Sequence, residues 1–380
     1  MNGFSRVLMA YTKQKSDCVP IYCGSVSSRV ASHYLGHEAY VGGGIQRWRE
    51  ARALYEGPDA HAEYLERSRA DALAWAEVCD FDFVRPTYWR YAIKPSEIID
   101  DNTFRFVRDD GTEYVMRYIP SSEIFDCVYD SKPALDDPDD LEPQVEAMEK
   151  KAANYVPQLD FSDYHAAMAH FDYQRAAYVG GLSLAIPNTS QLWYEAVVLR
   201  PDLVERYLEA QLTVALKNIP VIAASGARFV FGGGDCANNR GLNYSPRIFR
   251  ELLVPRFRKI SDECKKYGIF HTFGSDGRFW DVADDLYIDA GIDGHYEQDV
   301  ASEMSIRAVR EKYPHITCIG GVSAATLDSK PKEAIIAEVT AAMTAAKELG
   351  GAIIGCSNLI SPSTPIENVD LLLELLHKMR

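Results

Sequence analysis

Residues 269–274 read IFHTFG, and this short apolar run is one of four that decide the fold. The other three are IDGHYEQ (292–298), HITCIGG (315–321) and AIIGCSN (352–358). Each run has the length of a buried strand and is rich in β-branched or aromatic residues. Helical stretches follow them, to about 290, over 302–313, over 331–349 and from Pro365 to Lys378. Strands that alternate with helices through short connections require a parallel sheet.

The same alternation extends towards the N-terminus. ARFVFGGGD (227–235) adds a fifth unit, and Ser245-Pro246 predicts the cap and first residue of a long helix that ends at Gly268. Further strand candidates are VPIYCG (19–24), FDFVRPTYW (81–89) and AAYVGGLSLA (176–185). No GxGxxG motif follows the first strand, so an open dinucleotide-binding sheet is disfavoured. We therefore predict the α/β class and a (β/α)8 TIM-type barrel with extra N-terminal helices, one domain over residues 1–380.

Two segments fall outside this repeat. FRFVRDDGTEYVMRYI (104–119) alternates in period two around Asp110-Gly111, which predicts an inserted β-hairpin at about 103–119. The acidic stretch at about 131–145 contains PALDDPDDLEPQ, and we interpret it as a solvated loop that runs into a helix, or as a lid.

Composition excludes several classes of function. The net charge of −15 argues against nucleic acid, because a phosphate backbone is bound by clustered Lys and Arg. The eight cysteines include no CxxC pair, which favours a reduced, intracellular protein. No long apolar segment resembles a signal peptide or a membrane span, so we expect a cytoplasmic protein without a membrane partner. The oligomeric state stays open.

Several polar residues fall at the carboxyl ends of the strands, where barrel enzymes carry their active sites. These are Asp235, Cys236, His271, Glu297, Gln298, Ser323 and Cys356. A single His or Cys inside a strand is more often a core residue. A His, a Glu and a Cys at the same end of three strands can instead converge on one zinc ion and leave a position open for substrate, which is the composition of a catalytic site.

The motifs in residues 225–380 resemble the uroporphyrinogen decarboxylase superfamily. They are the long helix after Ser-Pro, the strand end His-x-x-Gly (271–274), the strand end Gly-Gly-Val (320–322) and P-x-T-P-x-E-N (362–368). The N-terminal part, with Arg29 and YLGHEAY (34–40), is similar more loosely. The arginine- and glycine-rich motif that holds porphyrinogen carboxylates is absent from VPIYCGSVSSRVASHYLG (19–36), which disfavours porphyrinogen decarboxylation.

The resemblance therefore favours the other branch, the corrinoid-dependent methyltransferases. It implies a zinc-dependent enzyme that moves a methyl group between a small methyl donor and a corrinoid (cobalamin) on a separate protein, with His271, Glu297 and Cys356 as metal ligands. Phe273 stands where relatives hold a ligand cysteine. Zinc is then held by His271, Glu297 and Cys356 alone, or a neighbour such as Asp235, Cys236 or Asp276 replaces the cysteine, or zinc is absent. Loss of a soft thiolate favours an oxygen-bearing donor, so we predict O-demethylation of a methyl ether, aromatic in our first interpretation.

Further residues are candidate contacts. His271, Glu297 and Asp235 are candidate catalytic residues, and Arg29, Asn238, Phe273 and Tyr296 are candidate substrate contacts, although alternation would turn Tyr296 towards the helices. Two alternatives stay open. One is a zinc-free decarboxylase or lyase that uses Asp235, His271 and Arg29. The other is a non-catalytic protein that binds a corrinoid or tetrapyrrole.

Overall fold

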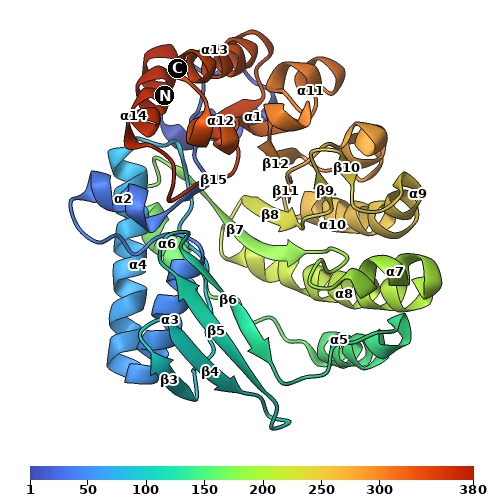
Figure 1. Ribbon diagram of the computed structural model, residues 1–380. Helices are drawn as coiled ribbons and strands as arrows, with labels where there is room; N and C mark the ends of the chain where they lie inside the picture. The colour runs from blue at the N-terminus through green and yellow to red at the C-terminus, as the bar shows by residue number, and fades with distance from the viewer.

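The computed structural model describes all 380 residues, and a parallel sheet of seven strands that curls into a barrel lies at its centre (Figure 1). The order along the sheet is β14-β13-β12-β11-β8-β7-β2. In chain order these strands are β2 (Phe83–Val84), β7 (Ala176–Ser183), β8 (Phe229–Gly233), β11 (Phe270–Gly274), β12 (Gly294–Gln298), β13 (Thr317–Val322) and β14 (Ala352–Cys356).

Residues 20–22 close the barrel between the two ends of this sheet. Ile21 forms a parallel bridge with Ile354 of β14. The amide of Tyr22 donates to the carbonyl of Ile354 at 3.0 Å, and the amide of Asp82, next to β2, donates to the carbonyl of Ile21 at 3.1 Å. This stretch lies inside the predicted strand 19–24 and takes the eighth position. The predicted (β/α)8 TIM-type barrel is therefore confirmed. Just beyond the closure, β1 (Ser25–Val26) pairs with β15 (Leu359–Ile360).

Helices follow the strands on the outside of the barrel (Figure 1). The predicted helix after Ser245 is confirmed: the side chain of Ser245 accepts from the amide of Ile248, and Pro246 is the first helical residue. This helix continues through a π-helical segment, η2 (Phe249–Leu253), into α10. None of the helices is long and apolar enough to cross a membrane. The main outer helices are α4 (Pro58–Val78), α6 (Ser162–His170), α8 (Pro201–Ala224), α9 (Pro246–Ile248), α10 (Val254–Lys266), α11 (Ile306–Lys312), α13 (Lys332–Leu349) and α14 (Ile366–Met379).

Shorter elements connect these units. They are α2 (Ser28–Leu35), α3 (Gly44–Glu56), α7 (Gln191–Leu199), β9 (Ala237–Asn238), β10 (Gly241–Leu242), η3 (Trp280–Val282), η4 (Asp285–Asp289), η5 (Val300–Ser302) and α12 (Ala324–Ser329).

The apolar core forms two layers. The outer and larger layer lies between the strands and the helices, and the smaller layer fills the inside of the barrel. Helix α1 (Gly3–Thr12) closes one end of the interior, because the ring of Tyr11 lies 4.9 Å from Phe229 and 5.0 Å from Phe270, the first residues of β8 and β11. The opposite end, where the strands finish, is therefore the open one, and we call it the barrel mouth.

The insertion after β2 is larger than the predicted hairpin. The hairpin itself is present as β4 (Thr103–Val107) and β5 (Glu113–Ile119), and the flanking β3 (Glu97–Asp100) and β6 (Ile124–Asp130) extend it to four antiparallel strands. One face of this sheet packs on α3 through a separate small core that includes Trp48, Phe104 and Phe125. The acidic segment that follows contains η1 (Pro138–Leu141) and the start of α5 (Glu142–Asn154).

Candidate active site at the barrel mouth

Alternation along β11 decides which of its side chains reach the inside of the barrel. Phe270 packs on the interior aromatic rings, and the hydroxyl of Thr272 lies 2.5 Å from the hydroxyl of Tyr11 in the interior. His271 and Phe273 have the opposite parity, so they point outward to the helices. The prediction that His271 faces the site is wrong for this reason.

His271 is fully buried between β11 and α10. Its Nδ1 lies 2.9 Å from the hydroxyl of Ser261 on α10, and its Nε2 has no partner. Burial lowers the pKa of His271 to about 4, so the imidazole is neutral at physiological pH. A neutral, fully buried ring that is held by Ser261 on the helix side of the sheet is a packing residue of the outer core.

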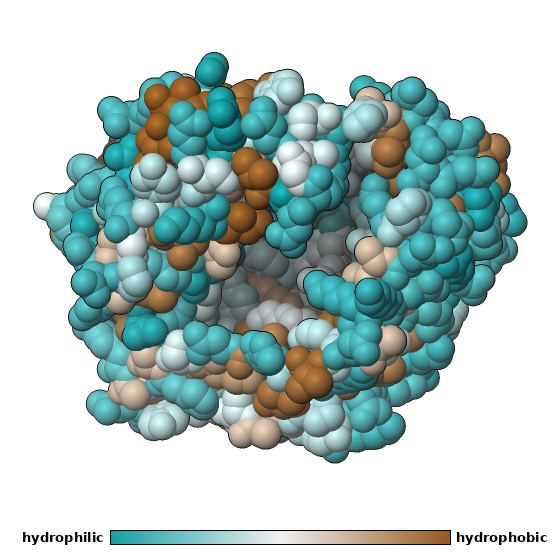
Figure 2. All heavy atoms as spheres, turned by 90° about the horizontal axis from the view of Figure 1, so that it is seen from below, coloured by the Kyte–Doolittle hydropathy of each residue, from teal (hydrophilic) through white to brown (hydrophobic).

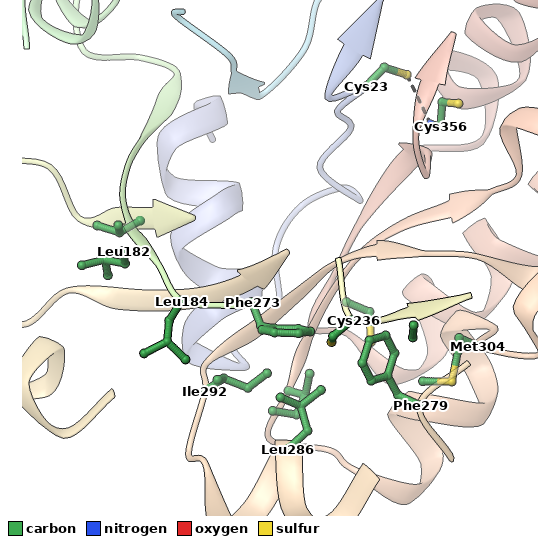
Figure 3. Close-up of a cluster of buried hydrophobic side chains, with 14 of the residues drawn as sticks. Cys23, Leu182, Leu184, Cys236, Phe273, Phe279, Leu286, Ile292, Met304 and Cys356 are labelled. Atoms are coloured by element: carbon green, nitrogen blue, oxygen red, sulfur yellow. Dashed lines mark hydrogen bonds between the residues drawn. The ribbon is translucent and has the colours of Figure 1, made fainter. Parts of the chain in front are cut away.

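Phe273 and Cys356 also lie in the outer core. Phe273 packs against Phe257, with ring centroids 5.3 Å apart. It also packs against Phe279, with ring centroids 5.6 Å apart (Figure 3). Cys356 lies beside Cys23, whose sulfur accepts from the amide of Cys356 at 3.4 Å, apart from the Phe273 group (Figure 3). Burial raises the pKa of the Cys356 thiol well above its usual value.

The predicted zinc ligands therefore do not converge. His271 and Cys356 occupy the outer core on separate strands, and no group of three His, Cys, Asp or Glu side chains is arranged to hold a metal ion. The prediction that the Phe273 replacement alters the ligand set is also wrong, because that side chain lies outside the barrel. The residues present do not fit a zinc site of the predicted composition.

Glu297 is the one member of the trio at the barrel mouth. A register shift between Tyr296 and Gln298 forms a β-bulge in β12, and Glu297 occupies it with a φ of 76°. A non-glycine residue in the left-handed region is uncommon and is often found at functional sites. The bulge breaks the alternation of side chains along β12, so the consecutive residues Tyr296 and Glu297 both point towards the inside of the barrel.

The surroundings of Glu297 keep it protonated. Burial, reinforced by the carboxylates of Asp276 and Asp235, raises the pKa of Glu297 to about 8, and Arg85 opposes this rise. Burial and the neighbouring Asp235 also raise the pKa of Asp276. The side chain of Asn358 donates to Asp276 at 3.2 Å. The mouth thus holds a carboxylic acid that is still protonated at neutral pH.

Aromatic rings form a wall inside the mouth. Tyr178 stacks on Phe231 with centroids 4.0 Å apart, and Tyr296 lies 5.2 Å from Phe231. The ring centroids of Tyr22 and Tyr296 are 6.0 Å apart. The hydroxyl of Tyr22 donates to the hydroxyl of Tyr178 at 2.9 Å. Tyr296 therefore points inward, contrary to the direction that alternation predicted.

A cavity of about 220 Å³ lies beside Tyr178, and its lining residues include neither Glu297 nor Arg85. Its walls are mostly apolar and include Pro86, Leu159, Phe161 and Tyr164. The molecular face on which the four-stranded sheet lies is hollowed at its centre, with a largely hydrophilic rim (Figure 2). A small ligand with an apolar body matches the lining of the cavity.

The remaining candidates lie at the rim or away from the mouth. Asp235 is exposed on the loop after β8, and Asn238 is exposed in β9, where its side chain accepts from the amide of Arg240. Arg29 lies on α2, and its guanidinium donates to the carbonyls of Pro362 and Thr364. Arg29 thus ties α2 to the C-terminal segment, so its predicted substrate contact is replaced by a structural one.

Sequence reasoning missed Arg85, which follows β2 directly. The available signal was a charged residue straight after an apolar strand, FDFVRPTYW, at the same end as Asp235 and Glu297. Tyr178 was also missed, because the sequence reasoning considered the ends of the strands and not the inward residues of their interiors.

Known proteins resemble this chain in sequence and in fold. Residues 180–379 match the family model described as Uroporphyrinogen decarboxylase (URO-D). Among solved structures, a methyltransferase from Methanosarcina mazei is 18% identical with a TM-score of 0.59, and the match covers 100% of this chain and 99% of that chain. A xylose isomerase-like TIM barrel protein from Mycobacterium smegmatis is 15% identical with a TM-score of 0.29, over 66% of this chain and 90% of that chain. No curated protein matches this chain.

Proposed function

The chain belongs to the uroporphyrinogen decarboxylase (URO-D) family, and from that premise we propose that it moves a methyl group from a small methyl donor to a corrinoid on a separate protein. The donor that we favour is an O-methyl compound, with an aromatic methyl ether as the first candidate. Two findings support methyl transfer: the family itself and the fold likeness to a methyltransferase over the whole chain.

One observation carries the choice of an oxygen donor. Glu297 is a protonated carboxylic acid at an aromatic-lined mouth, because burial and neighbouring carboxylates raise its pKa to about 8. An ether oxygen is a poor leaving group unless a proton or a Lewis acid reaches it. A general acid whose pKa lies near the working pH is suited to that task.

The proposed step balances without an added metal. The corrinoid Co(I) donates an electron pair to the methyl carbon and becomes methyl-Co(III). The carbon–oxygen bond breaks, and its electron pair stays on the oxygen. Glu297 gives its proton to that oxygen, which leaves as the phenol or alcohol. Solvent then returns a proton to Glu297.

The proposed step does not use zinc, and metal analysis tests whether the protein binds it. The predicted ligands do not converge, so no step is derived through the metal. We expect metal analysis of the purified protein to find that Cys356→Ser does not change its zinc content. One zinc per chain that disappears in Cys356→Ser would instead restore the zinc mechanism and displace Glu297 as the sole activator.

The direct experiment follows the absorbance of Co(I). Purified protein is mixed with cob(I)alamin or a reduced corrinoid protein and a panel of methyl ethers, with dimethyl sulfide as the thioether control. We expect conversion to methylcobalamin with aryl methyl ethers, and a loss of at least about 100-fold in Glu297→Gln, the scale of a removed general acid. Conversion with the thioether alone would contradict an oxygen donor.

The structure disfavours one alternative, and the same experiment tests the other. A zinc-free decarboxylase or lyase built from Asp235, His271 and Arg29 is disfavoured, since His271 faces α10 and Arg29 binds the C-terminal segment. A non-catalytic protein would bind a corrinoid without demethylating any donor in the panel.

A further inference from the structure

Arg85 is held rigidly at the barrel mouth by backbone and hydroxyl oxygens. Its Nη1 donates to the carbonyl of Gly24 at 3.0 Å and to the hydroxyl of Ser25 at 2.6 Å. Its Nε donates to the carbonyl of Thr87 at 3.1 Å. The guanidinium also lies over the ring of Trp89, 4.3 Å from its centroid. Four contacts therefore fix the plane of this cation before any ligand arrives.

None of these contacts neutralises the charge. Arg85 forms no salt bridge, although the chain carries 55 acidic residues. Its oxygen partners are neutral, and its Nη2 donates to no protein atom. A fixed and partly buried cation with a spare donor is suited to bind an anionic oxygen.

The number of free nitrogens limits the kind of anion. A carboxylate or phosphate is usually bound by two parallel N–H groups of one arginine. Here Nη1 and Nε are already occupied, which leaves only Nη2. This geometry suits a single anionic oxygen better than a two-oxygen group.

Two contacts place Arg85 beside the aromatic wall. Its guanidinium lies over the ring of Tyr88, 5.0 Å from the centroid. Gly24, whose carbonyl accepts from Arg85, lies against Tyr296, since an added Cβ at Gly24 would lie 1.8 Å from the Tyr296 hydroxyl. Burial raises the pKa values of Tyr22 and Tyr296 well above their usual range, so these hydroxyls stay neutral donors. The cation therefore lies among neutral aromatic rings.

We infer that Arg85 stabilises the negative charge that develops on the leaving oxygen of an aryl ether in the transition state, while the proton of Glu297 is transferred to that oxygen. The inference rests on the proposed function for the identity of the reaction. It extends that function by assigning the oxyanion contact to a residue that the proton transfer from Glu297 does not include. The tyrosine and phenylalanine wall would hold the ring of the same phenol.

The test uses 4-nitrophenol, which is the product that demethylation of 4-nitroanisole would release. Its phenolate is yellow and its phenol is not, so absorbance reports the ionisation of the bound molecule without any corrinoid. We expect the wild-type protein to lower the apparent pKa of bound 4-nitrophenol by about one unit, a tenfold shift of the ionisation equilibrium. Arg85→Met should abolish the shift, and Arg85→Lys should retain part of it.

Folding and binding are checked separately, because Arg85 also braces the loop of Thr87. Circular dichroism and the melting temperature report the fold of each variant, and quenching of tryptophan fluorescence, to which Trp89 contributes, reports binding. Glu297→Gln should keep the ionisation shift while it loses turnover. In kinetics with 4-nitroanisole, Arg85→Met should lower kcat much more than it raises KM, because the charge develops only in the transition state.

Two outcomes would overturn the inference. One is a folded Arg85→Met protein in which bound 4-nitrophenol ionises as it does in the wild type. The other is a wild-type protein that does not bind 4-nitrophenol. If the shift depends on Arg85 but no methyl ether is demethylated, the oxyanion contact stands and the proposed methyl transfer fails. The two claims therefore fail separately.

Discussion

Glu297 combines an unusual backbone conformation with an unusual protonation state. Because its pKa is raised to about 8, the acid form is present below pH 8 and is lost as the pH rises through that value. Methyl transfer that uses this proton should therefore hold steady from pH 6 to 7 and fall about tenfold per unit above pH 8. The measurement is kcat against pH with a saturating aryl methyl ether, and a rate that rises through pH 8 would exclude the acid role.

His271 is a packing residue, so we expect its titration to change the stability of the protein and not the rate of methyl transfer. Burial lowers its pKa to about 4 from a usual value near 6.5, so the unfolded chain takes up a proton in that window and the folded protein does not. Its contribution to stability is present above pH 6.5 and is lost as the pH falls towards 4. The variant His271→Gln should therefore show a flatter loss of stability between pH 6.5 and 4.

The activity of this variant separates packing from catalysis. His271→Gln should lose about 1–3 kcal/mol of stability at pH 7 through imperfect packing, with kcat unchanged. Ser261→Ala, which removes the partner hydroxyl, is the matched control and should also leave kcat unchanged. Urea denaturation at several pH values gives the stabilities. A loss of kcat of more than tenfold in a folded His271→Gln protein would return His271 to the reaction.

At the scale of the element, the order of strands and helices could be predicted from the sequence, but their faces could not. Apolar runs and caps locate a strand such as 270–274 or a helix start such as Ser245. The inward face changes with a shift of one residue, so His271 was assigned to the wrong side. Glu297 reaches the mouth only through a β-bulge, which leaves no clear trace in a five-residue strand.

Only part of the inserted four-stranded sheet could be predicted from the sequence. Asp110-Gly111 marked its central hairpin, while β3 and β6 depend on packing against α3. Gly44, the first residue of α3, touches β6 so closely that an added Cβ would lie 2.5 Å from both the carbonyl oxygen of Glu123 and the amide of Phe125. A side chain at this position would force the backbone of β6 to move, which lowers the stability of the contact.

Gly44→Ala should therefore loosen the sheet from α3, at a cost of about 1–3 kcal/mol. The expected result is faster amide hydrogen exchange in β5 and β6 and earlier proteolytic cleavage near 120–130. Gly180→Ala is the matched control, since its added Cβ meets no atom within 4 Å. Equal exchange rates in β5 and β6 of Gly44→Ala and the wild type would show that the contact does not hold the sheet in place.

At the scale of the whole molecule, the barrel depends on a seam between segments more than 300 residues apart. Residues 20–22 pair with β14, and an added Cβ at Gly355 would lie 1.7 Å from the carbonyl oxygen of Tyr22. The same seam carries Tyr22 and Gly24, which present the aromatic wall and an anchor of Arg85 to the mouth. Closure of the barrel therefore also positions part of the proposed site.

Gly355→Ala should open this seam and damage both properties together. We expect a loss of about 3 kcal/mol, the upper end of the range for overpacking, and a matching loss of the Arg85-dependent ionisation of 4-nitrophenol. Gly274→Ala, in β11 of the same sheet, is the control, because the nearest atom to an added Cβ is 3.3 Å away. If Gly355→Ala melts earlier yet binds and ionises 4-nitrophenol like the wild type, the seam supports the barrel without shaping the mouth, and the link between closure and site would be wrong.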